Sequence, residues 1–446
     1  MATAPEAHPR DRLRRELRLR DGSLLVVSGV IGSGIFLTPA VIAGLIPHPG
    51  VVLLAWLLGG LLSLAGALAN AELGTMFPRA GGDYVYLREA FHPLAGFLVG
   101  WLSFFVIYAG TVATLAAGFS AALGVFVPIT ETGQAAVALA LVWAVSGLNY
   151  VGVRWGVLAN NLTAVVKVGA LVAFSVLGIW FGAGSLENLR PMGRSVSDLS
   201  WVGFGLALSP VLFSYLGWNS TIYVASELRN PRRNVPWSLF LGVALCTGVY
   251  LLMNTVYLYA LPVDRLQAAP NAGEAAARAL FGAGSGTLVG VFVLVSILGT
   301  LNATILVGAR IAYAMALDGL FFRRVDRAHP RFHTPGAAII VQASSATVIL
   351  LGLGTFERAL DYTTFAILLA TIADVAALFR LRRTQPDAPR PYRAWGHPWV
   401  PGLYIVVCGA IAGALLWGRP TECLAGLGLL ALGLPFYAFF RKRAAG

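Results

Sequence analysis

Charged side chains are scarce in this sequence. Asp, Glu, Lys and Arg make up 12% of its 446 residues and hydrophobic residues make up 57%, whereas soluble domains carry about a quarter charged residues. Four long stretches contain no charged side chain, namely 90–130, 168–186, 199–226 and 279–309. A membrane-spanning helix needs about 20 mostly apolar residues, and the alternating segments of about ten residues that build a barrel do not occur. The sequence therefore excludes a soluble domain and predicts an all-α polytopic membrane protein.

Cysteine and histidine are scarce as well. The three cysteines, Cys246, Cys408 and Cys423, lie in or beside predicted spans, so they suggest no disulfide framework. The six histidines fall in tails, loops or span ends, and neither a His-Glu-x-x-His zinc motif nor a Gly-x-Ser-x-Gly elbow occurs. A membrane enzyme would lack its catalytic groups, so we expect no catalytic activity, no cofactor and no metal.

The net charge of +12 is explained by topology. Twelve spans are predicted, at 22–44, 51–75, 91–127, 134–152, 160–183, 202–227, 234–261, 285–317, 336–353, 359–381, 399–417 and 421–440. If both termini are cytoplasmic, 24 of the 32 basic residues lie inside and six lie in outer loops, as the positive-inside rule requires. We therefore expect a multi-pass protein of the cell (inner) membrane and no nucleic-acid partner. The arginine-rich residues 1–20 read as a cytoplasmic arm rather than a signal peptide.

Two spans contain helix breakers at matching positions. The first carries the glycines of 29–34 and the sixth carries Pro210 and Gly217, and three glycines within six residues weaken a helix. Because these spans are five helices apart, the second set of five enters the membrane in the opposite sense. Interrupted helices in inverted halves indicate a transporter site at mid-membrane. The predicted organisation is 1–20 as the arm, 21–183 as helices 1–5, 202–381 as helices 6–10, and 399–440 as helices 11 and 12.

The electrostatics of a broken helix suit a zwitterion. Freed N–H groups at the start of one half-helix attract a carboxylate, and freed C=O groups at the end of the other attract an ammonium group. An α-amino acid carries both charges about one backbone unit apart. Channels also use broken helices, but they need rings of repeated polar groups, whereas this chain has one pseudo-pair.

Three motifs in order resemble the amino acid–polyamine–organocation superfamily, and within it the L-type amino acid transporters. They are Gly-Val-Ile-Gly-Ser-Gly-Ile-Phe at 29–36, Pro-Arg-Ala-Gly-Gly-Asp-Tyr at 78–84 continuing to Phe91, and Phe-Ser-Tyr-Leu-Gly-Trp-Asn at 213–219 continuing to Pro236. The likeness runs from about residue 20 to the end. It implies a LeuT-type five-plus-five inverted repeat with broken helices 1 and 6, two added helices, and alternating access, with the site between spans 1, 3, 6, 8 and 10.

The resemblance also implies roles for individual residues. Ile31, Gly32, Ser33 and Gly34 would bind the substrate carboxylate, and the stretch with Phe213, Ser214, Tyr215 and Gly217 would receive the amino group. Phe213 would also close over the substrate from outside, the alternative being ordinary packing. Asn219 matches a polar position near the site, where it would touch substrate or only join helices by hydrogen bonds.

Lys167 is one of only two lysines and falls inside the fifth span, where a charge is costly unless it is paired or faces a polar cavity. In the resembled family a lysine here takes the place of a sodium ion, so its ammonium would brace the broken first span and the carrier would be sodium-independent. Proton coupling through this lysine and snorkelling to the inner interface are the alternatives.

The remaining charges bear on substrate and partners. The acids within spans are Glu72, Asp361 and Asp374, and none adjoins the breaks in sequence, which favours neutral amino acids over cationic amino acids or polyamines, the alternative function. The loop at 128–133 has no cysteine, so we expect no disulfide-linked accessory subunit. Where the family often has two adjacent acids, this chain has Ser226 and Glu227. Asp83, Arg88 and Glu89 would join an inner gate with an arginine at 229, 232 or 233, or else lie in solvent.

Overall fold

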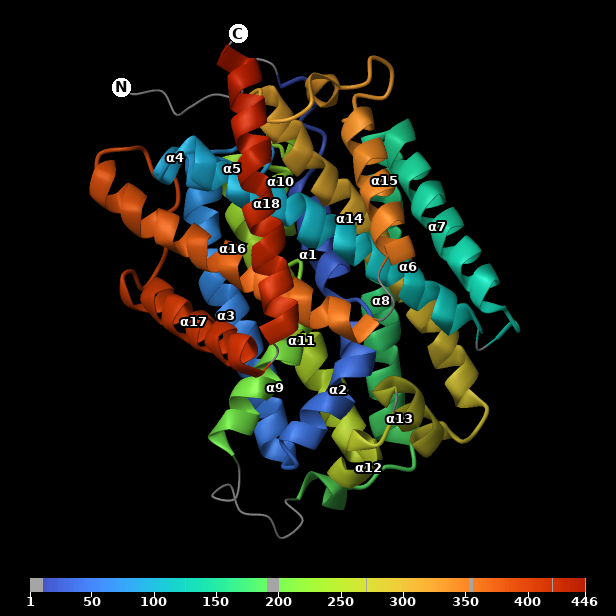
Figure 1. Ribbon diagram of the computed structural model, residues 1–446. Coiled ribbons are helices and arrows are strands. Elements are labelled where there is room, and N and C mark those ends of the chain that lie inside the picture. The colour runs from blue at the N-terminus through green and yellow to red at the C-terminus, as the bar shows by residue number, and fades with distance from the viewer. Residues whose placement is uncertain are drawn as a thin grey trace.

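The computed structural model describes residues 11–124, 126–190, 200–269, 271–352, 356–418 and 420–445. Within them the protein is a bundle of helices with no sheet, and an isolated backbone bridge joins Leu17 to Leu228. Residues 11–18 and the end of α18 (Pro420–Ala445) lie at the same end of the bundle, at the top of Figure 1. We call this the termini end.

The first half of the chain forms long apolar helices joined by short connections. They are α1 (Leu19–Val30), α2 (Gly34–Leu45), α3 (Pro49–Met76), α4 (Asp83–Ala90), α5 (Pro93–Trp101), a π-helical turn η1 (Leu102–Tyr108), α6 (Ala109–Gly124), α7 (Glu131–Val151) and α8 (Val153–Phe181). Helix α5, η1 and α6 form one continuous span. Helix α4 is the short loop helix that the Gly81-Gly82 pair introduces; both glycines have positive φ.

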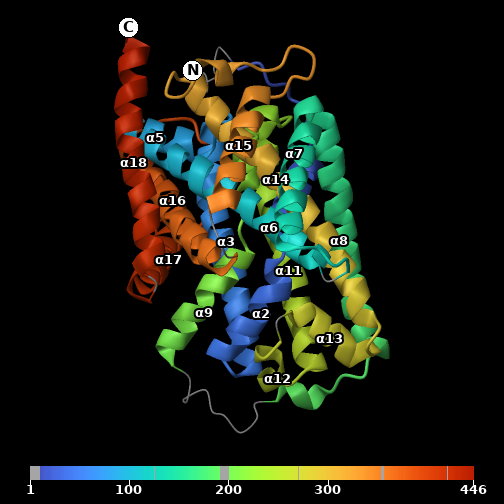
Figure 2. The ribbon, with the colours of Figure 1, turned by 45° about the vertical axis from the view of Figure 1, so that its right-hand side comes forward.

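The second half is also helical within the described residues. It contains η2 (Leu186–Leu189), α9 (Trp201–Ser214), α10 (Ser220–Tyr223), η4 (Ala225–Glu227), α11 (Pro231–Ala260), α12 (Val263–Gln267), α13 (Ala272–Phe281), α14 (Ser285–Leu317), η5 (Arg323–Asp326), α15 (Gly336–Gly352), α16 (Phe356–Thr384) and α17 (Trp399–Gly418). Helices α12 and α13 cover the end opposite the termini end (Figures 1 and 2). Each of the twelve predicted spans thus overlaps a helix or a broken helix.

Nine of the described helices are long and apolar enough to cross a membrane, or ten if the bent pair α1–α2 counts as one span. Two further apolar helices, Gly203–Ser214 and Gly336–Gly352, are shorter. The protein is therefore a multi-pass membrane protein. Asp361, predicted within a span, lies outside the residues whose side chains are described, as do Arg194, Arg358 and Arg419, three of the six basic residues that the predicted spans leave in outer loops.

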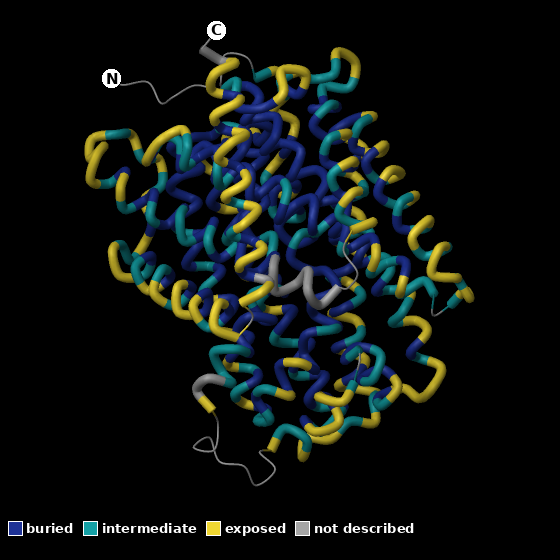
Figure 3. Tube along the Cα trace, in the orientation of Figure 1, coloured by how far each residue is buried: buried dark blue, intermediate teal, exposed yellow. Residues whose placement is uncertain are grey.

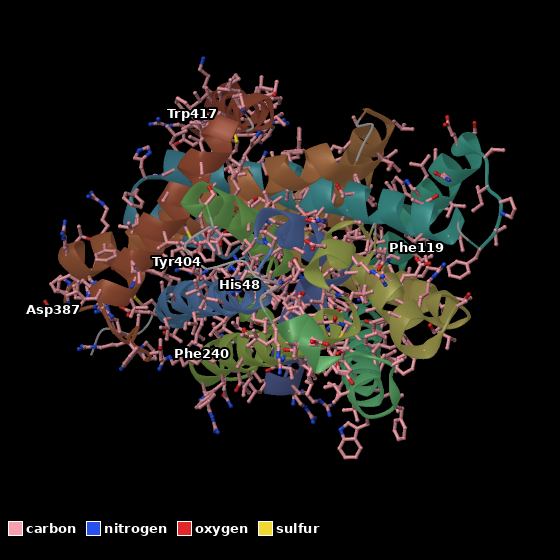
Figure 4. The ribbon with its side chains drawn as sticks, turned by 90° about the horizontal axis from the view of Figure 1, so that it is seen from below. His48, Phe119, Phe240, Asp387, Tyr404 and Trp417 are labelled. Atoms are coloured by element: carbon pink, nitrogen blue, oxygen red, sulfur yellow. The ribbon has the colours of Figure 1, made fainter. Side chains whose placement is uncertain are left out.

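Large apolar side chains on the outer faces of the bundle support a lipid environment. Exposed residues lie along α7, α17 and α18 while buried residues fill the centre (Figure 3). Trp399 and Trp417 begin and nearly end α17 and are 83% and 92% exposed; Trp417 lies at the periphery in Figure 4. Their separation is about 27 Å at 1.5 Å per residue, close to the hydrocarbon thickness of about 30 Å. Tryptophans at both ends of a span are typical of helices anchored at two membrane interfaces.

Candidate functional site

The first span is broken where the sequence predicts. Helix α1 ends at Val30 and α2 begins at Gly34, with a bend of 46° between them. The backbone N–H of Ile31 still closes the last turn of α1 on the Val27 carbonyl, 2.8 Å away. Helix α2 begins without a side-chain cap, and the first N–H groups of any helix have no partner within it. The start of α2 therefore presents a positive dipole end to its surroundings.

The sixth span is broken at the matching place. Helix α9 ends at Ser214, a turn runs over 215–219, and α10 begins at Ser220. Gly217 sits in this turn with φ +92°, a conformation that L side chains rarely adopt. A Cβ atom built on Gly217 would lie 2.8 Å from the carbonyl carbon of Gly29. The two broken spans thus cross backbone against backbone, and a side chain at this crossing would force them apart.

A cavity opens at this crossing between five groups of helices. Its lining comes from α1 and α2, from η1 and α6, from α9 and α10, from α14, and from α16. Of the sequence-predicted residues it includes Gly32, Ser33, Gly34, Phe213, Ser214, Gly217 and Asn219. The remaining lining is mostly aliphatic or hydroxylated, including Ile107, Thr111, Ala303, Thr304 and Ile367. A small amphipathic ligand matches such a surface.

Two predicted substrate residues do not line this cavity. The Ile31 carbonyl accepts from Lys167 Nζ at 2.6 Å and from Thr300 Oγ1 at 3.1 Å. Tyr215 is fully buried, and its hydroxyl donates to the Trp56 carbonyl at 3.0 Å. Both residues hold the breaks in place instead of facing the cavity.

Lys167 lies behind the break in span 1. It comes from α8 and is fully buried. Its Nζ donates to the carbonyls of Ser28, at 3.1 Å, and Ile31, at 2.6 Å, and contacts Thr300 Oγ1 at 2.9 Å. These oxygens belong to α1, the break after it and α14. The ammonium therefore fills a small cage of oxygens and joins α8 to the broken span; it does not reach the interface by snorkelling.

Tyr250 of α11 joins the two breaks to each other. Its hydroxyl lies 2.7 Å from the carbonyl of Val30 and 2.8 Å from the carbonyl of Ser214. The ring packs edge-on against Trp56 and Tyr215. A tyrosine in an apolar span carries no motif, so sequence reasoning missed it; a hydroxyl on a predicted buried span was the only signal.

A second polar group lies toward the termini end of the cavity. Asp83, the first residue of α4, lines the cavity and accepts a hydrogen bond from the Tyr223 hydroxyl. Asn219 Nδ2 donates to the same hydroxyl at 3.3 Å. The sequence analysis placed Asp83 at an inner gate with arginines or in solvent, yet it is 1% exposed. The carboxylate enters the cavity because the Gly81-Gly82 turn folds α4 back against α16.

The ion pairs at the termini end differ from those predicted. Glu89 pairs with Arg88 and Arg79, and Arg88 also binds Asp318. These ion pairs do not involve the predicted arginines at 229, 232 and 233. Arg310 Nε and Nη2 bind the two oxygens of Glu227 at 2.8 and 3.1 Å, with both side chains 1% exposed. At this place the family often has two adjacent acids, whereas here Ser226 precedes Glu227 and Glu227 is the acid that binds Arg310.

The N-terminal segment covers this end. The Leu17 N–H donates to the Glu227 carbonyl at 3.0 Å, and the Arg229 N–H donates to the Leu17 carbonyl at 2.8 Å. Nearer the start of the segment, Tyr313 Oη donates to Asp11 Oδ1 at 3.2 Å and accepts from the Arg12 N–H at 3.1 Å. Burial of Asp11 raises the pKa of its carboxyl. Residues 11–18 therefore form a strap across η4 and α14.

Glu72, an acid inside the second span, is neutralised by one arginine in the last turn of α16 and one in the segment that follows it. Its carboxylate accepts from Arg382, from Arg390 Nε at 3.1 Å, and from the Ala394 N–H at 2.6 Å. The intramembrane charge is thus part of a structural cluster and faces no substrate.

An apolar helical bundle with two broken helices meeting at a central cavity defines a polytopic membrane permease. The chain belongs to the amino acid permease family, whose model matches residues 19–422. It is accordingly a transporter and not an enzyme.

Named relatives cover nearly the whole chain. The serine/threonine exchanger SteT of Bacillus subtilis is 30% identical over 97% of this chain and 98% of its own length. The human large neutral amino acids transporter small subunit 2 is 29% identical over 95% of this chain and 80% of its own. The human b(0,+)-type amino acid transporter 1 is 30% identical, covering 96% and 88%.

Proposed function

We propose that this chain is a sodium-independent secondary transporter of neutral L-amino acids, either an exchanger or a proton-linked permease, working by alternating access. We assign it twelve spans, with 21–183 and 202–381 as inverted five-helix repeats and 399–440 as two added helices. The basic bias predicts that residues 1–20 and both termini are cytoplasmic, in a cell (inner) membrane. The absence of cysteine at 128–133 supports function without a disulfide-linked subunit.

The observation that carries the proposal is the meeting of two broken helices at one cavity. The uncapped start of α2, at Gly32 to Gly34, offers N–H groups and a positive dipole end for a carboxylate. The end of α9 at Ser214 offers a negative dipole end for an ammonium group. Because Gly34 and Ser214 are in van der Waals reach of each other, one amino acid backbone spans both ends. Phe213, on the cavity wall, is assigned as the aromatic lid.

The cage around Lys167 supports the proposal of sodium independence. Backbone carbonyls and a threonine hydroxyl are also the ligands that hard cations prefer. Here the ammonium already occupies the space between the Ser28 and Ile31 carbonyls and Thr300. A positively charged lysine therefore supplies the same stabilisation of the broken span without an ion gradient.

Neutral substrates are supported by the names of the relatives and by the cavity wall. The compared exchanger and transporters carry serine, threonine and large neutral amino acids in their names. The described wall holds one carboxyl group, Asp83, which already accepts from Tyr223. That same carboxyl favours a second candidate, a cationic amino acid or polyamine permease of the same fold.

The test is uptake of radiolabelled amino acids into proteoliposomes. We expect neutral amino acids to enter vesicles preloaded with amino acid, with equal rates in sodium and choline. Competition by arginine and putrescine against the best neutral substrate separates the two candidates. Strict sodium dependence would contradict the assignment of Lys167, and uptake of putrescine or arginine alone would replace the neutral assignment with the second candidate.

A further inference from the structure

A second carboxyl group lies beside Asp83 at the termini end of the cavity. Asp374 of α16 contacts Asp83 from one side, and Asn70 of α3 lies close to Asp374 on another without making a hydrogen bond of normal geometry to it. Asp374 and Asn70 are fully buried, and Asp83 and Tyr223 are exposed by 1% and 2%. Four helices, α3, α4, α10 and α16, thus bring two acids and an amide together out of contact with solvent.

If both acids are ionised, several carboxylate oxygens in this group have no hydrogen-bond donor in the described part of the chain. Tyr223 donates to Asp83 Oδ2, whereas Asp83 Oδ1 and both Asp374 oxygens have no conventional donor among the described residues. The buried amide of Asn70 and the hydroxyl of Tyr86 also lack a conventional partner there. Carboxylates only accept hydrogen bonds, so two carboxyl groups in contact need a proton between them.

The surrounding charges do not neutralise the pair. The titratable groups that face it are tyrosines from four elements, Tyr86, Tyr108, Tyr223 and Tyr404. The nearby cations bind other carboxylates: Arg88 binds Asp318 and Glu89, Arg310 binds Glu227, and Arg382 binds Glu72. Among the described residues no cation balances the two acids, and two buried carboxyl groups that share a site without a cation retain a proton.

We propose that Asp83 and Asp374 form a proton-binding site on the substrate path, holding one proton while the termini end is closed and releasing it to water when that end opens. This inference rests on the proposed transport function and deepens it, because it selects the proton-linked form of the carrier. Binding adds one H⁺ from water to one carboxylate, and release returns the same proton to water. The protonation of Asp83 affects substrate binding because Asp83 lines the cavity and binds Tyr223 of the broken span 6.

The direction of the pH dependence follows from burial. Burial raises the pKa of Asp83, and the hydrogen bond from Tyr223 offsets part of this rise. A carboxyl group whose pKa is higher in the folded chain stabilises the fold in its protonated form, and this stabilisation is lost as pH rises through the raised pKa. Above the midpoint the protonated fraction falls about tenfold per pH unit.

The first test observes the proton without relying on transport. Difference infrared spectroscopy of the purified protein distinguishes the carbonyl stretch of a protonated carboxylic acid from the bands of a carboxylate. We expect such a band in the wild type, its loss on titration to alkaline pH, and its disappearance in both Asp374→Asn and Asp83→Asn. Asp387→Asn, an exposed acid on the outside of the molecule (Figure 4), removes the same charge and should keep the band. A wild type without the band, or an unchanged band in both variants, overturns the proposal.

The second test links the proton to transport. In proteoliposomes, an inward proton gradient should drive accumulation of a neutral amino acid by the wild type and by Asp387→Asn. Asp374→Asn imitates the protonated pair, so its gradient-driven accumulation should fall by a larger factor than its exchange at equal pH. Accumulation and pH profile that match the wild type would refute the pair as the coupling site. A wild type that transports no amino acid at all would contradict the proposed function, while the infrared band would still report whether the pair holds a proton.

Discussion

The structural roles of several residues in this protein are not evident from their residue type alone. Lys167 and Glu72 are both charged and both lie in spans, yet Lys167 holds the broken helix beside the cavity while Glu72 binds arginines away from it. Tyr215 and Tyr223 lie on the same broken span, but only Tyr223 lines the cavity. The difference is set by the direction in which each side chain leaves its helix and by what the neighbouring helices present there.

Replacement of Lys167 is the sharpest test at the residue scale. Lys167→Ala leaves the carbonyls of Ser28 and Ile31 without the ammonium, and hydrogen bonds to a charged group contribute about 1.5–3 kcal/mol each. We expect transport to fall by about tenfold or more, measured as initial exchange rate per folded protein. The matched control is Lys442→Ala, which removes the only other lysine, at the exposed end of α18. Near-normal transport by a well-folded Lys167→Ala protein would contradict its bracing role.

At the scale of elements, the breaks depend on glycine where two backbones cross. The turn after α9 approaches the end of α1 so closely that the three atoms nearest to a Cβ built on Gly217 are all backbone atoms of Gly29. The helices on either side are ordinary apolar segments. The carbonyl groups at their ends accept hydrogen bonds from Tyr250 and Lys167, which come from two other helices. The site is therefore a joint between four helices, and its geometry is held by backbone contacts.

Gly217→Ala should disturb this joint. The added Cβ would lie 2.8 Å from the Gly29 carbonyl carbon, and the positive φ is strained for alanine by about 1–3 kcal/mol. We expect a lower midpoint of thermal unfolding in detergent and loss of most transport. Gly248→Ala is the control, since its Cβ meets open space on the outer face of α11 and alanine favours the helix by about 1 kcal/mol. Equal effects of the two substitutions would show that the crossing tolerates a side chain.

At the scale of the whole molecule, the two ends are built differently. The termini end is closed by the 11–18 strap and by ion pairs, of which Arg310–Glu227 is the most deeply buried. The opposite end is covered by the short helices α12 and α13 (Figure 2). Between them the outer faces are apolar and carry tryptophans near both interfaces. Opening of the termini end therefore requires that the strap and the buried pair separate.

The Arg310–Glu227 pair should lock the closed form. Glu227→Gln leaves a buried guanidinium without its carboxylate, and breaking such a pair costs about 3–5 kcal/mol. We expect a clear loss of stability in thermal unfolding. The double variant Glu227→Leu with Arg310→Met removes both charges and should recover much of that loss. A double variant no more stable than Glu227→Gln would mean that the pair's charge balance is not what holds η4 against α14.

Much of the fold was predictable, and less of the site. The twelve predicted spans each overlap a helix, and the two breaks fall at the predicted glycines, because apolar length and helix breakers are local properties. The cavity includes Gly32, Ser33 and Gly34 but not Ile31 or Tyr215, and their roles in binding stay predictions. Sequence reasoning found no acid next to the breaks along the chain and placed Asp83 at an inner gate or in solvent, whereas Asp83 lines the cavity. In an apolar span both the lipid face and the core face are apolar, so periodicity does not reveal which residues face inward.

The sequence by itself determined that the protein lies in a membrane, that it belongs to the class of helical transporters, and where its helices break. Scarce charge and apolar segments long enough to cross a bilayer leave the membrane as the only suitable environment, and glycines at 29–34 and 217 weaken helices wherever they fold. Only the tertiary structure decided which side chains meet: Asp83 with Asp374, Lys167 with the Ile31 carbonyl, and Tyr250 with both breaks. These pairs are separated by tens to hundreds of residues, and their contact depends on how the helices rotate and pack against one another, which local sequence does not specify.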